Sequence, residues 1–445
     1  MSKVIETLDI TSLTDKGDGI ASLGSRRVFV AGALPGETVT AELFGIKAGY
    51  AQGQLLEVLQ PSPARREPFC RHSECGGCQL GTLDYQAQLE MKAERVGKAL
   101  AARGLEADIA PCLGMSSPLG YRNKSLYNVL AQDGVSDIGF FKKHSHQLVA
   151  ADDCPVQGDK VPALLAEVRR WMHDFAIQGY NEAEHSGQLR GVMVREGRAT
   201  GQWMLVLVAL GDNLPGLDAL IDALGKACPW LTSLVLNINP ERGNRILGHE
   251  ERVLLGSAVI EDRLGGLNFA LSGQSFFQIN PEQTEKLYAT ALDFAALTGA
   301  EQVFDLYCGI GTISLLLAKK AKSVVGIELV EQAIIDARAN AERNGISNAE
   351  FHAGKAELLL AELNQQGHNA DVVLLDPPRK GCDGAVLDTL LAMAPATLVY
   401  VSCDPDSLAR DLAKLCAGGY RLDKVQPVDM FPHSLHVETV VRLVR

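Results

Sequence analysis

A cysteine follows a short apolar segment in the carboxyl-terminal part of this chain. Residues 398–401 are the kind of apolar, partly β-branched run that forms a buried parallel strand, and Ser402, Cys403, Asp404 and Pro405 come next. Ligands and reactive groups of open α/β sheets lie at the carboxyl ends of the strands. An isolated cysteine is more often a buried structural residue. Two other features, a glycine-rich turn and a later glutamate, make Cys403 a predicted nucleophile.

The glycine-rich turn lies upstream of this cysteine. Residues 303–306 read as a strand, residues 307–312 as a turn with the sequence Tyr-Cys-Gly-Ile-Gly-Thr, and a second strand ends at Glu328. Mononucleotide-binding βαβ units place a carboxylate at this point to accept hydrogen bonds from ribose hydroxyls. Ser314 stands where the dinucleotide fingerprint has its third glycine. The turn therefore fits S-adenosylmethionine better than a pyrophosphate.

Two carboxylates stand at the ends of neighbouring expected strands. Asp376 follows the strand 371–375 and opens an Asp-Pro-Pro turn. Glu438 begins a final alternating strand, after His433 and His436. A carboxylate on a surface strand is common, so surface and site roles are both open for Glu438.

Three cysteines cluster after a proline-rich linker. Cys70, Cys75 and Cys78 share one short loop with two glycines, which let the chain fold round a metal and expose amides to sulfur. Cys154, in an Asp-Asp-Cys-Pro turn, is the best-placed fourth ligand. Ten cysteines in a chain of this length indicate metal binding or catalysis rather than a disulfide scaffold. Zinc and iron–sulfur both accept four thiolates, so the metal remains open.

Composition limits the class of protein. The chain has 445 residues, 47% of them hydrophobic, and a formal net charge of −12. It has neither a membrane-spanning apolar run nor the apolar segment of a signal peptide at its start, so we expect a cytoplasmic protein. The acidic charge argues against non-specific coating of nucleic acid, although a local basic face can still bind it.

Such basic residues occur beside aromatic ones between the third and fourth cysteines. Arg122 and Lys124 follow Tyr121, and Lys142 and Lys143 follow Phe141. Cations that neutralise phosphates and rings that stack on bases are typical of RNA binding. A solvated sheet edge would show the same pattern.

The patterns predict three domains in an α/β protein. Residues 1–62 alternate short strands with glycine and proline turns, which indicates a β-barrel, either structural or OB-like and RNA-binding. Residues 63–270 mix strand and helix patterns, including a helical stripe over 84–103, and predict an α+β domain. Residues 271–445 repeat strand and helix and predict a Rossmann-like α/β domain, and the family resemblance described next implies that it is a class I methyltransferase domain.

Five motifs together resemble the RNA 5-methyluridine methyltransferases. They are Phe276-Phe-Gln-Ile-Asn280, Asp305-Leu-Tyr-Cys-Gly-Ile-Gly-Thr312, Asp376-Pro-Pro-Arg379, Ser402-Cys-Asp-Pro405 and His436-Val-Glu-Thr439. The barrel resembles a TRAM domain, and the four cysteines, Cys70, Cys75, Cys78 and Cys154, resemble the ligands of that family's 4Fe-4S cluster. A chain with both the barrel and the cluster is most similar to the bacterial 23S ribosomal RNA uracil-5 enzymes. We expect the related transfer-RNA enzymes to lack both features.

The resemblance implies a role for each motif. Cys403 would add to carbon 6 of uracil, and Glu438 would remove the proton from carbon 5 after methyl transfer from S-adenosylmethionine. It implies cofactor contacts by Gln278, Tyr307, Thr312, Glu328 and Asp376. Phe276 would stack on a flipped base, and the remaining expected RNA contacts are Arg122, Lys124, Lys142 and Lys143.

Three alternatives remain. An amino-group methyltransferase would use the Asp-Pro-Pro turn without a thiol, a transfer-RNA uracil enzyme would share all the chemistry, and a non-catalytic iron–sulfur protein would bind RNA without turnover. The favoured interpretation is a monomeric 23S ribosomal RNA enzyme with a structural cluster, and no DNA or membrane partner.

Overall fold

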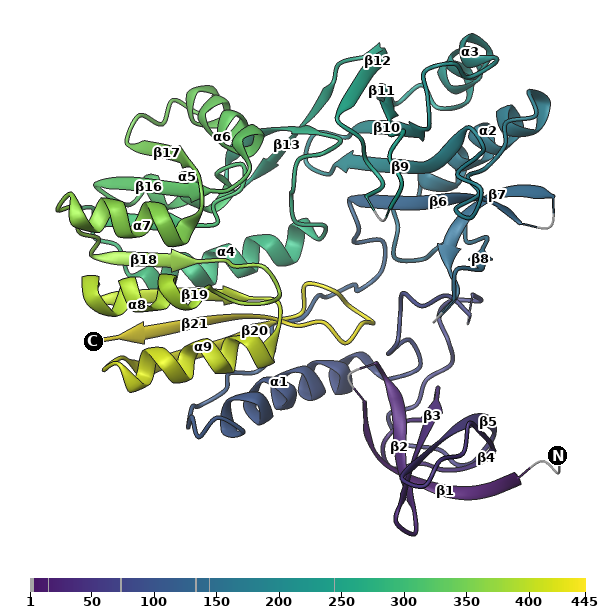
Figure 1. Cartoon of the computed structure of the whole chain (residues 1–445), viewed down its shortest axis with the longest axis horizontal. Coiled ribbons are helices and arrows are strands. Elements are labelled where there is room, and N and C mark those ends of the chain that lie inside the picture. The colour runs from purple at the N-terminus through teal and green to yellow at the C-terminus, as the bar shows by residue number, and fades with distance from the viewer. Residues whose placement is uncertain (1–3, 15, 73, 133, 144, 244) are drawn as a thin grey trace.

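The computed structural model describes the chain except for residues 1–3, 15, 73, 133, 144 and 244. It shows an amino-terminal barrel, a central sheet with helices, and a carboxyl-terminal sheet flanked by helices (Figure 1). The predicted fold class is confirmed, whereas the domain boundaries after residues 62 and 270 stay a prediction. Within the described residues, no helix is both long and apolar enough to span a membrane.

The barrel closes with the strand order β1-β2-β3-β5-β4. Alternate residues along each strand point inward, among them Leu8, Val28, Val30 and Val39, and these are fully or almost fully buried. The strands are β1 (Val4–Leu13), β2 (Asp18–Leu23), β3 (Arg26–Ala31), β4 (Thr38–Phe44) and β5 (Tyr50–Gln60). The period of two in the sequence thus gives a barrel with a small apolar interior.

The central sheet has the order β12-β11-β10-β9-β6-β7-β8. Helices α2 (Val161–Asp174) and α3 (Leu217–Ala227) pack with one of its apolar faces. The strands are β6 (Lys124–Gln132), β7 (Val135–Phe141), β8 (Leu148–Val149), β9 (Leu189–Gly197), β10 (Gln202–Ala209), β11 (Leu231–Ile238) and β12 (Glu250–Gly256). Side chains of β9 to β11, such as Met193 and Val206, pack into the same core as the hairpin β13 (Val259–Leu264)–β14 (Leu267–Ser272) and the carboxyl-terminal sheet. One continuous core therefore joins these two sheets.

The carboxyl-terminal sheet has the order β17-β16-β15-β18-β19-β21-β20. Its strands are β15 (Gln302–Leu306), β16 (Ser323–Glu328), β17 (Ala349–Ala353), β18 (Val372–Leu375), β19 (Thr397–Ser402), β20 (Arg421–Val428) and β21 (Glu438–Val444). The helices of this part are α4 (Pro281–Ala295), α5 (Thr312–Ala318), α6 (Glu331–Arg343), α7 (Ala356–Gln365), α8 (Gly384–Met393) and α9 (Pro405–Ala417). The first five strands in the order are parallel, and β21 is antiparallel to both neighbours. The chain order reverses between β15 and β18, the point where such sheets bind ligands.

Helix α1 (Tyr85–Ala101) comes early in the chain but packs against α9 and β20 of the carboxyl-terminal part (Figure 1). Val96 and Leu100 belong to the same apolar core as the residues of β18 and β19. The helix predicted over 84–103 is confirmed. Its partner is a surface of the carboxyl-terminal domain, which the local helical pattern does not specify.

Candidate active site

The antiparallel pair β19–β21 brings two predicted site residues together. Ser402 is the register partner of Thr439, so Cys403 and Glu438 lie next to each other just beyond that pair. Strand β18 lies on the other side of β19, and Asp376 directly follows it. Cys403 is partly exposed, whereas Glu438 is 4% exposed. A thiol and two carboxyls thus share one edge of the sheet.

Burial controls the protonation of this group. Burial, then the negative charges of Glu438 and Asp376, raises the pKa of Cys403 to about 11, while Arg379 opposes the shift. Burial and Asp376 raise the pKa of Glu438 to about 8, again against Arg379. Burial raises the pKa of Asp376 to about 7. Without ligands, the thiol is neutral at pH 7, and the two carboxyls titrate close to neutral pH rather than in the usual acidic range.

The glycine-rich turn between β15 and α5 has the backbone expected of a nucleotide-binding loop. Tyr307, Gly309 and Gly311 all have positive φ angles, of 69°, 55° and 81°. The Gly309 N–H donates to the Glu328 carboxylate over 3.2 Å. A side chain at Gly311 would bring its Cβ to 3.1 Å from the Phe351 ring. The turn is therefore tight, and Glu328 lies at its mouth with both carboxylate oxygens accepting backbone hydrogen bonds.

Ser314 occupies the position of the third glycine of the dinucleotide fingerprint, and its side chain has a partner there. Its hydroxyl donates to the carboxylate of Asp305, and both residues are fully buried beneath the turn. Burial raises the pKa of Asp305 to about 8, and the Ser314 hydrogen bond opposes this. The serine thus bonds one oxygen of a buried acid, at a place where a dinucleotide fold needs close packing, while Asp305 Oδ1 has no hydrogen-bond partner among the described residues.

The remaining predicted cofactor residues, Thr312 and Gln278, contact different parts of the molecule. The Thr312 hydroxyl is 3.2 Å from the hydroxyl of Tyr288, on α4. Gln278 is buried and its backbone carbonyl accepts a hydrogen bond from the Asn123 side chain over 3.0 Å. Burial, followed by the charge of Asp376, raises the pKa of Tyr288, which places this phenol close to the carboxyl group. The sequence analysis missed Tyr288 because a buried aromatic residue on a helix reads as core.

Phe276 differs sharply from its neighbour. Its side chain is 67% exposed, whereas Phe277 is 4% exposed and belongs to the core. An exposed ring of this size is available to stack on a base.

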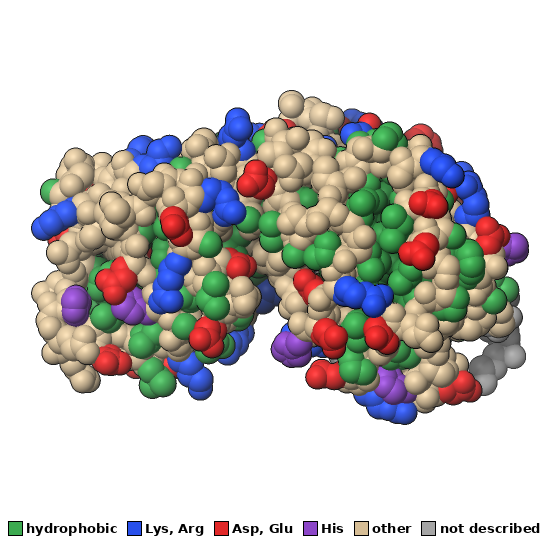
Figure 2. Space-filling model, turned by 90° about the horizontal axis from the view of Figure 1, so that it is seen from above, with side chains coloured by type: hydrophobic (Ala, Val, Ile, Leu, Met, Phe, Trp, Pro, Cys, Tyr) green, Lys and Arg blue, Asp and Glu red, His purple; other side chains and the backbone are tan. Residues whose placement is uncertain are grey.

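A cavity of about 720 Å³ opens onto Cys403. Cationic and imidazole side chains line it from five separate parts of the chain, and Asp404 is the acidic residue among the described lining residues. The basic lining residues are Lys16, Arg95, Lys142, Lys143 and Arg379, with His146 and His436. On the face shown in Figure 2, acidic and basic side chains are interspersed. The described lining of the cavity has more basic than acidic side chains, although the net charge of the chain is −12.

The predicted RNA residues fall into two groups. Lys142 and Lys143 line the cavity beside Cys403 and form ion pairs with Glu74 and Asp18. Lys124 is mostly enclosed: its ammonium faces the carbonyl of Gly273 over 3.4 Å, and burial lowers its pKa to about 7. That position is unfavourable for phosphate binding.

Arg122 lies with the cysteines rather than with the cationic cavity. A second cavity, of about 420 Å³, is lined by Cys70, Cys75, Cys78, Cys154 and the Arg122 side chain. Burial, then the charge of Cys154, raises the pKa of Cys78 to about 12, and Arg122 opposes the shift. The Arg122 Nε atom is buried and has no hydrogen-bond partner. Its charge is placed to balance thiolates.

The cysteine arrangement bears on the type of metal. Among the described residues, no three or more Cys, His, Asp or Glu side chains converge closely enough to hold a single ion. All four cysteines are free and line one cavity. A zinc ion would require every sulfur within about 2.3 Å of one point. Four thiolates round one cavity are also the donor set of a 4Fe-4S cluster, in which each would bind a different iron.

Relatives of this chain are RNA methyltransferases. An uncharacterized RNA methyltransferase of Halalkalibacterium halodurans is 44% identical over 98% of this chain and 95% of its own length. One from Clostridium tetani is 43% identical over 98% of this chain and 95% of its own. The tRNA (Uracil-5-)-methyltransferase family model matches residues 242–445, and the TRAM domain model matches residues 5–56. The chain belongs to the RNA 5-methyluridine methyltransferase family. The predicted family and its TRAM barrel are thereby confirmed.

A solved structure extends the likeness to the whole chain. The Pyrococcus abyssi tRNA (uracil-54, C5)-methyltransferase in complex with S-adenosyl-L-homocysteine is 29% identical, has a TM-score of 0.81, and covers 99% of this chain and 100% of its own. This chain is an S-adenosylmethionine-dependent RNA methyltransferase. Since a transfer-RNA enzyme matches along the barrel as well, the expectation that transfer-RNA enzymes lack the barrel is wrong.

Proposed function

We propose that this protein methylates carbon 5 of a uridine in RNA through a covalent adduct on Cys403, with Glu438 as the base. The observation that carries the proposal is the register of β19 and β21, which puts the thiol beside a buried carboxylate. The cation-lined cavity that opens onto Cys403 supports RNA as the substrate. An amino-group methyltransferase would have no use for this pairing.

The chemistry requires both groups. Carbon 5 of uracil is a weak nucleophile, so the Cys403 thiolate adds to carbon 6 and the electrons of the 5,6 double bond form an enolate that is nucleophilic at carbon 5. Carbon 5 would then take the methyl group from the sulfonium of S-adenosylmethionine, whose S–CH3 bond breaks to leave S-adenosylhomocysteine. The Glu438 carboxylate removes the proton left on carbon 5, the double bond re-forms, and the thiolate is expelled.

Arg379 has a supporting electrostatic role in this scheme. Its charge lowers the pKa of both Cys403 and Glu438, against the burial that raises them. Thiolate and carboxylate are the two reactive forms, so a cation at this position favours both.

S-adenosylmethionine and the target uracil would bind on either side of Cys403, Glu438 and Asp376. S-adenosylmethionine, the methyl donor, would be held by Gln278, Tyr307, Thr312, Glu328 and Asp376. Glu328, at the end of β16, would accept hydrogen bonds from the ribose hydroxyls, as in other βαβ nucleotide sites. The exposed ring of Phe276 would stack on RNA, and a uridine must leave its helix before a thiol can reach carbon 6.

The four cysteines would hold a 4Fe-4S cluster with a structural role. Their distribution round one cavity and the nearby Arg122 charge support this assignment. The cluster would join the loop at 70–78 to the turn at Cys154, which are far apart in sequence. Iron and acid-labile sulfide analysis of anaerobically purified protein tests it, and one zinc ion per chain without iron would contradict it.

We propose 23S ribosomal RNA as the substrate, because the cysteine set resembles that branch of the family. Transfer RNA is the second candidate, favoured by the Pyrococcus abyssi enzyme, which matches the barrel as well as the catalytic part. The barrel therefore does not distinguish the two substrates.

Nucleoside mass spectrometry tests reaction and substrate together. Unmodified 23S ribosomal RNA and transfer RNA are incubated separately with anaerobically purified protein and S-adenosylmethionine. We expect 5-methyluridine in the ribosomal RNA with the wild type and none with Cys403→Ala. Cys416→Ala, in α9 and also partly exposed, is the matched control and should retain activity. Product in transfer RNA alone would overturn the substrate assignment, and methylation by Cys403→Ala would overturn the mechanism.

A further inference from the structure

The segment between β20 and β21 carries the proposed base at its end and is held by unusual contacts. Residues 429–437 leave the sheet after Val428 and return at Glu438. At its centre, His433 is 6% exposed and has a φ angle of 66°, in the left-handed region that residues other than glycine avoid. Such a conformation persists where the surroundings over-determine it.

The loop that carries three cysteines contributes part of those surroundings. The Leu80 N–H donates to the His433 carbonyl over 2.9 Å, and the Phe69 ring lies 4.2 Å from the imidazole, centroid to centroid. Phe69 directly precedes Cys70, and Leu80 is two residues beyond Cys78. Both flanks of the cysteine loop therefore touch the same histidine.

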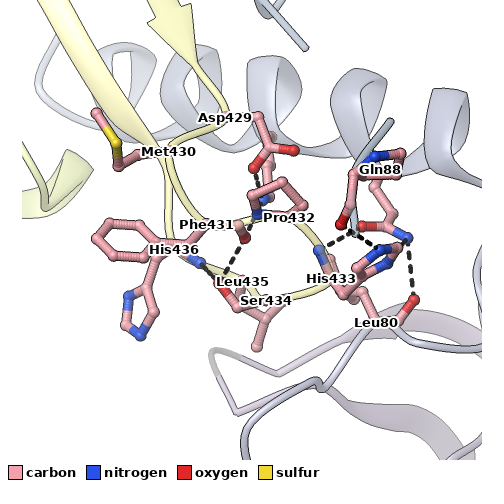
Figure 3. A network of polar contacts seen from close by, with 12 residues as sticks. Leu80, Gln88, Asp429, Met430, Phe431, Pro432, His433, Ser434, Leu435 and His436 are labelled. Atoms are coloured by element: carbon pink, nitrogen blue, oxygen red, sulfur yellow. Dashed lines mark hydrogen bonds and ion pairs between the residues drawn. The ribbon is translucent and has the colours of Figure 1, made fainter. Parts of the chain in front are cut away.

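Helix α1 holds His433 from the other side (Figure 3). The side-chain oxygen of Gln88, Oε1, accepts a hydrogen bond from the His433 backbone N–H over 3.0 Å. The side-chain nitrogen of Gln88, Nε2, lies 3.2 Å from the imidazole Nδ1. The same amide donates to the carbonyls of Leu80 and Leu83 over 3.1 and 2.8 Å. One glutamine thus ties the cysteine loop and the segment 429–437 to α1.

The hydrogen bonds define the protonation of this histidine. Its Nε2 lies 3.1 Å from the Pro118 carbonyl, which can only accept, so Nε2 carries the proton. Nδ1 is then an acceptor, and it shares the two hydrogens of the Gln88 amide with the Leu80 and Leu83 carbonyls. The neutral imidazole satisfies both of its partners, which explains how it remains buried.

The start of the segment is anchored separately. Lys92 and Asp429 form an ion pair with no solvent exposure, and Lys92 also donates to the Phe431 carbonyl over 3.1 Å. The Tyr85 hydroxyl donates to Asp429 over 2.7 Å. Because the beginning of the segment is fixed to α1, we expect a displacement of the His433 backbone to move the residues that lead to Glu438.

We infer that His433 is a positioning residue that couples the cysteine loop to the placement of Glu438. The inference rests on the proposed function and adds a regulated step to it. Disorder in the cysteine loop removes the Phe69 and Leu80 contacts, the strained His433 backbone relaxes, and Glu438 shifts away from carbon 5. Cysteine addition and methyl transfer precede proton removal, so the step that slows is the last one. The enzyme then retains methylated RNA as a covalent adduct.

His433→Gly is the test variant, because glycine tolerates the backbone angle while the imidazole is removed. His185→Gly is the matched control: His185 also has a positive φ angle, of 54°, and also contacts a proline carbonyl, that of Pro240, at 3.0 Å. Turnover, RNA affinity, the fraction of enzyme trapped on RNA in denaturing gels, and the melting temperature are measured for both.

We expect His433→Gly to lose turnover by about 10- to 100-fold, as for groups displaced by about an ångström. The trapped fraction should rise while RNA affinity stays near that of the wild type. His185→Gly should leave turnover and trapped fraction unchanged. Unchanged turnover in His433→Gly, or a parallel loss of turnover and adduct, overturns the inference.

Hydrogen exchange separates the inference from the proposed function. Peptides covering 429–437 are compared in protein before and after iron removal, and in Cys78→Ser. Faster exchange in this segment, with no change in the α3 peptides, supports the coupling even if no methylated product is found. Unchanged exchange in the segment overturns it even if the enzyme is active.

Discussion

Ser402 and Thr439 face each other across the antiparallel pair β19–β21, and this single register sets a thiol against a carboxylate. A slip of one residue would turn Glu438 to the opposite face of the sheet. The arrangement depends on β21 being antiparallel in an otherwise mainly parallel sheet, since a parallel strand would bring its carboxyl end to this edge.

Glu438→Gln separates addition from elimination. The amide keeps the size of the side chain but cannot accept the carbon 5 proton, so turnover should fall by about 10²- to 10⁴-fold. Adduct should accumulate, in contrast to Cys403→Ala, which forms none. Denaturing gels with labelled RNA and labelled methyl donor measure this. Loss of turnover without any adduct would contradict the role of Glu438 as the late base.

The pH dependence of the reaction follows from Glu438 and Cys403. The pKa of Glu438 is raised to about 8 and the pKa of Cys403 to about 11, and both groups react in their deprotonated forms. The rate at low RNA concentration should therefore rise with pH from 6 to 9. Stopped reactions in constant-ionic-strength buffers measure it, with RNA integrity as the control. A rate that is flat or falls between pH 7 and 9 would show that another group limits the reaction.

Lys92→Ala should destabilise the protein strongly. It removes one partner of a fully buried ion pair and leaves Asp429 charged in the interior, which costs about 3 to 5 kcal/mol of unfolding free energy. Lys98→Ala, on the same helix but in an exposed pair with Glu94, should cost about 1 kcal/mol or less. Denaturant unfolding measures both. Equal effects for the two variants would mean that the pair at Lys92 is solvated.

Lys16→Ala tests whether the barrel takes part in RNA binding at the cavity. Lys16 is exposed on the turn after β1 and lines the cavity with Cys403. Removing a phosphate contact should weaken RNA binding and reduce the slope of log affinity against log salt concentration by about 1. Lys226→Ala, at the end of α3, is the control. An unchanged salt slope for Lys16→Ala would exclude that contact.

Local patterns predicted much of the fold and part of the site. The apolar strand before Cys403 and the glycine turn after Asp305 are short-range features, and the structure has both where the sequence placed them. The proximity of Glu438 to Cys403 depends on a strand pairing between distant segments, which periodicity does not encode.

Which cationic residues can reach RNA was predicted less well from the sequence. The pattern that selected Lys124 and Arg122 identifies groups able to bind phosphate, but tertiary packing decides which of them reach solvent. Lys124 is enclosed beside Gly273, and Arg122 faces the cysteines. Lys16 and Arg95 line the cavity although neither lies in a basic cluster in the sequence.

The long reach of α1 has a consequence for synthesis on the ribosome. Lys92 is separated from Asp429 by 337 positions, so at 5–20 residues per second the helix waits roughly 20 to 70 s for its partner to be made. During that interval its ammonium stays in water, because burial without the carboxylate is unfavourable. The apolar stripe that includes Val96 and Leu100 is exposed for the same time and is a target for chaperones. Docking of α1 is thus a late event in folding during synthesis. The contacts of α1 with the segment 429–437 beside the cysteine loop form only after the last strands have been made.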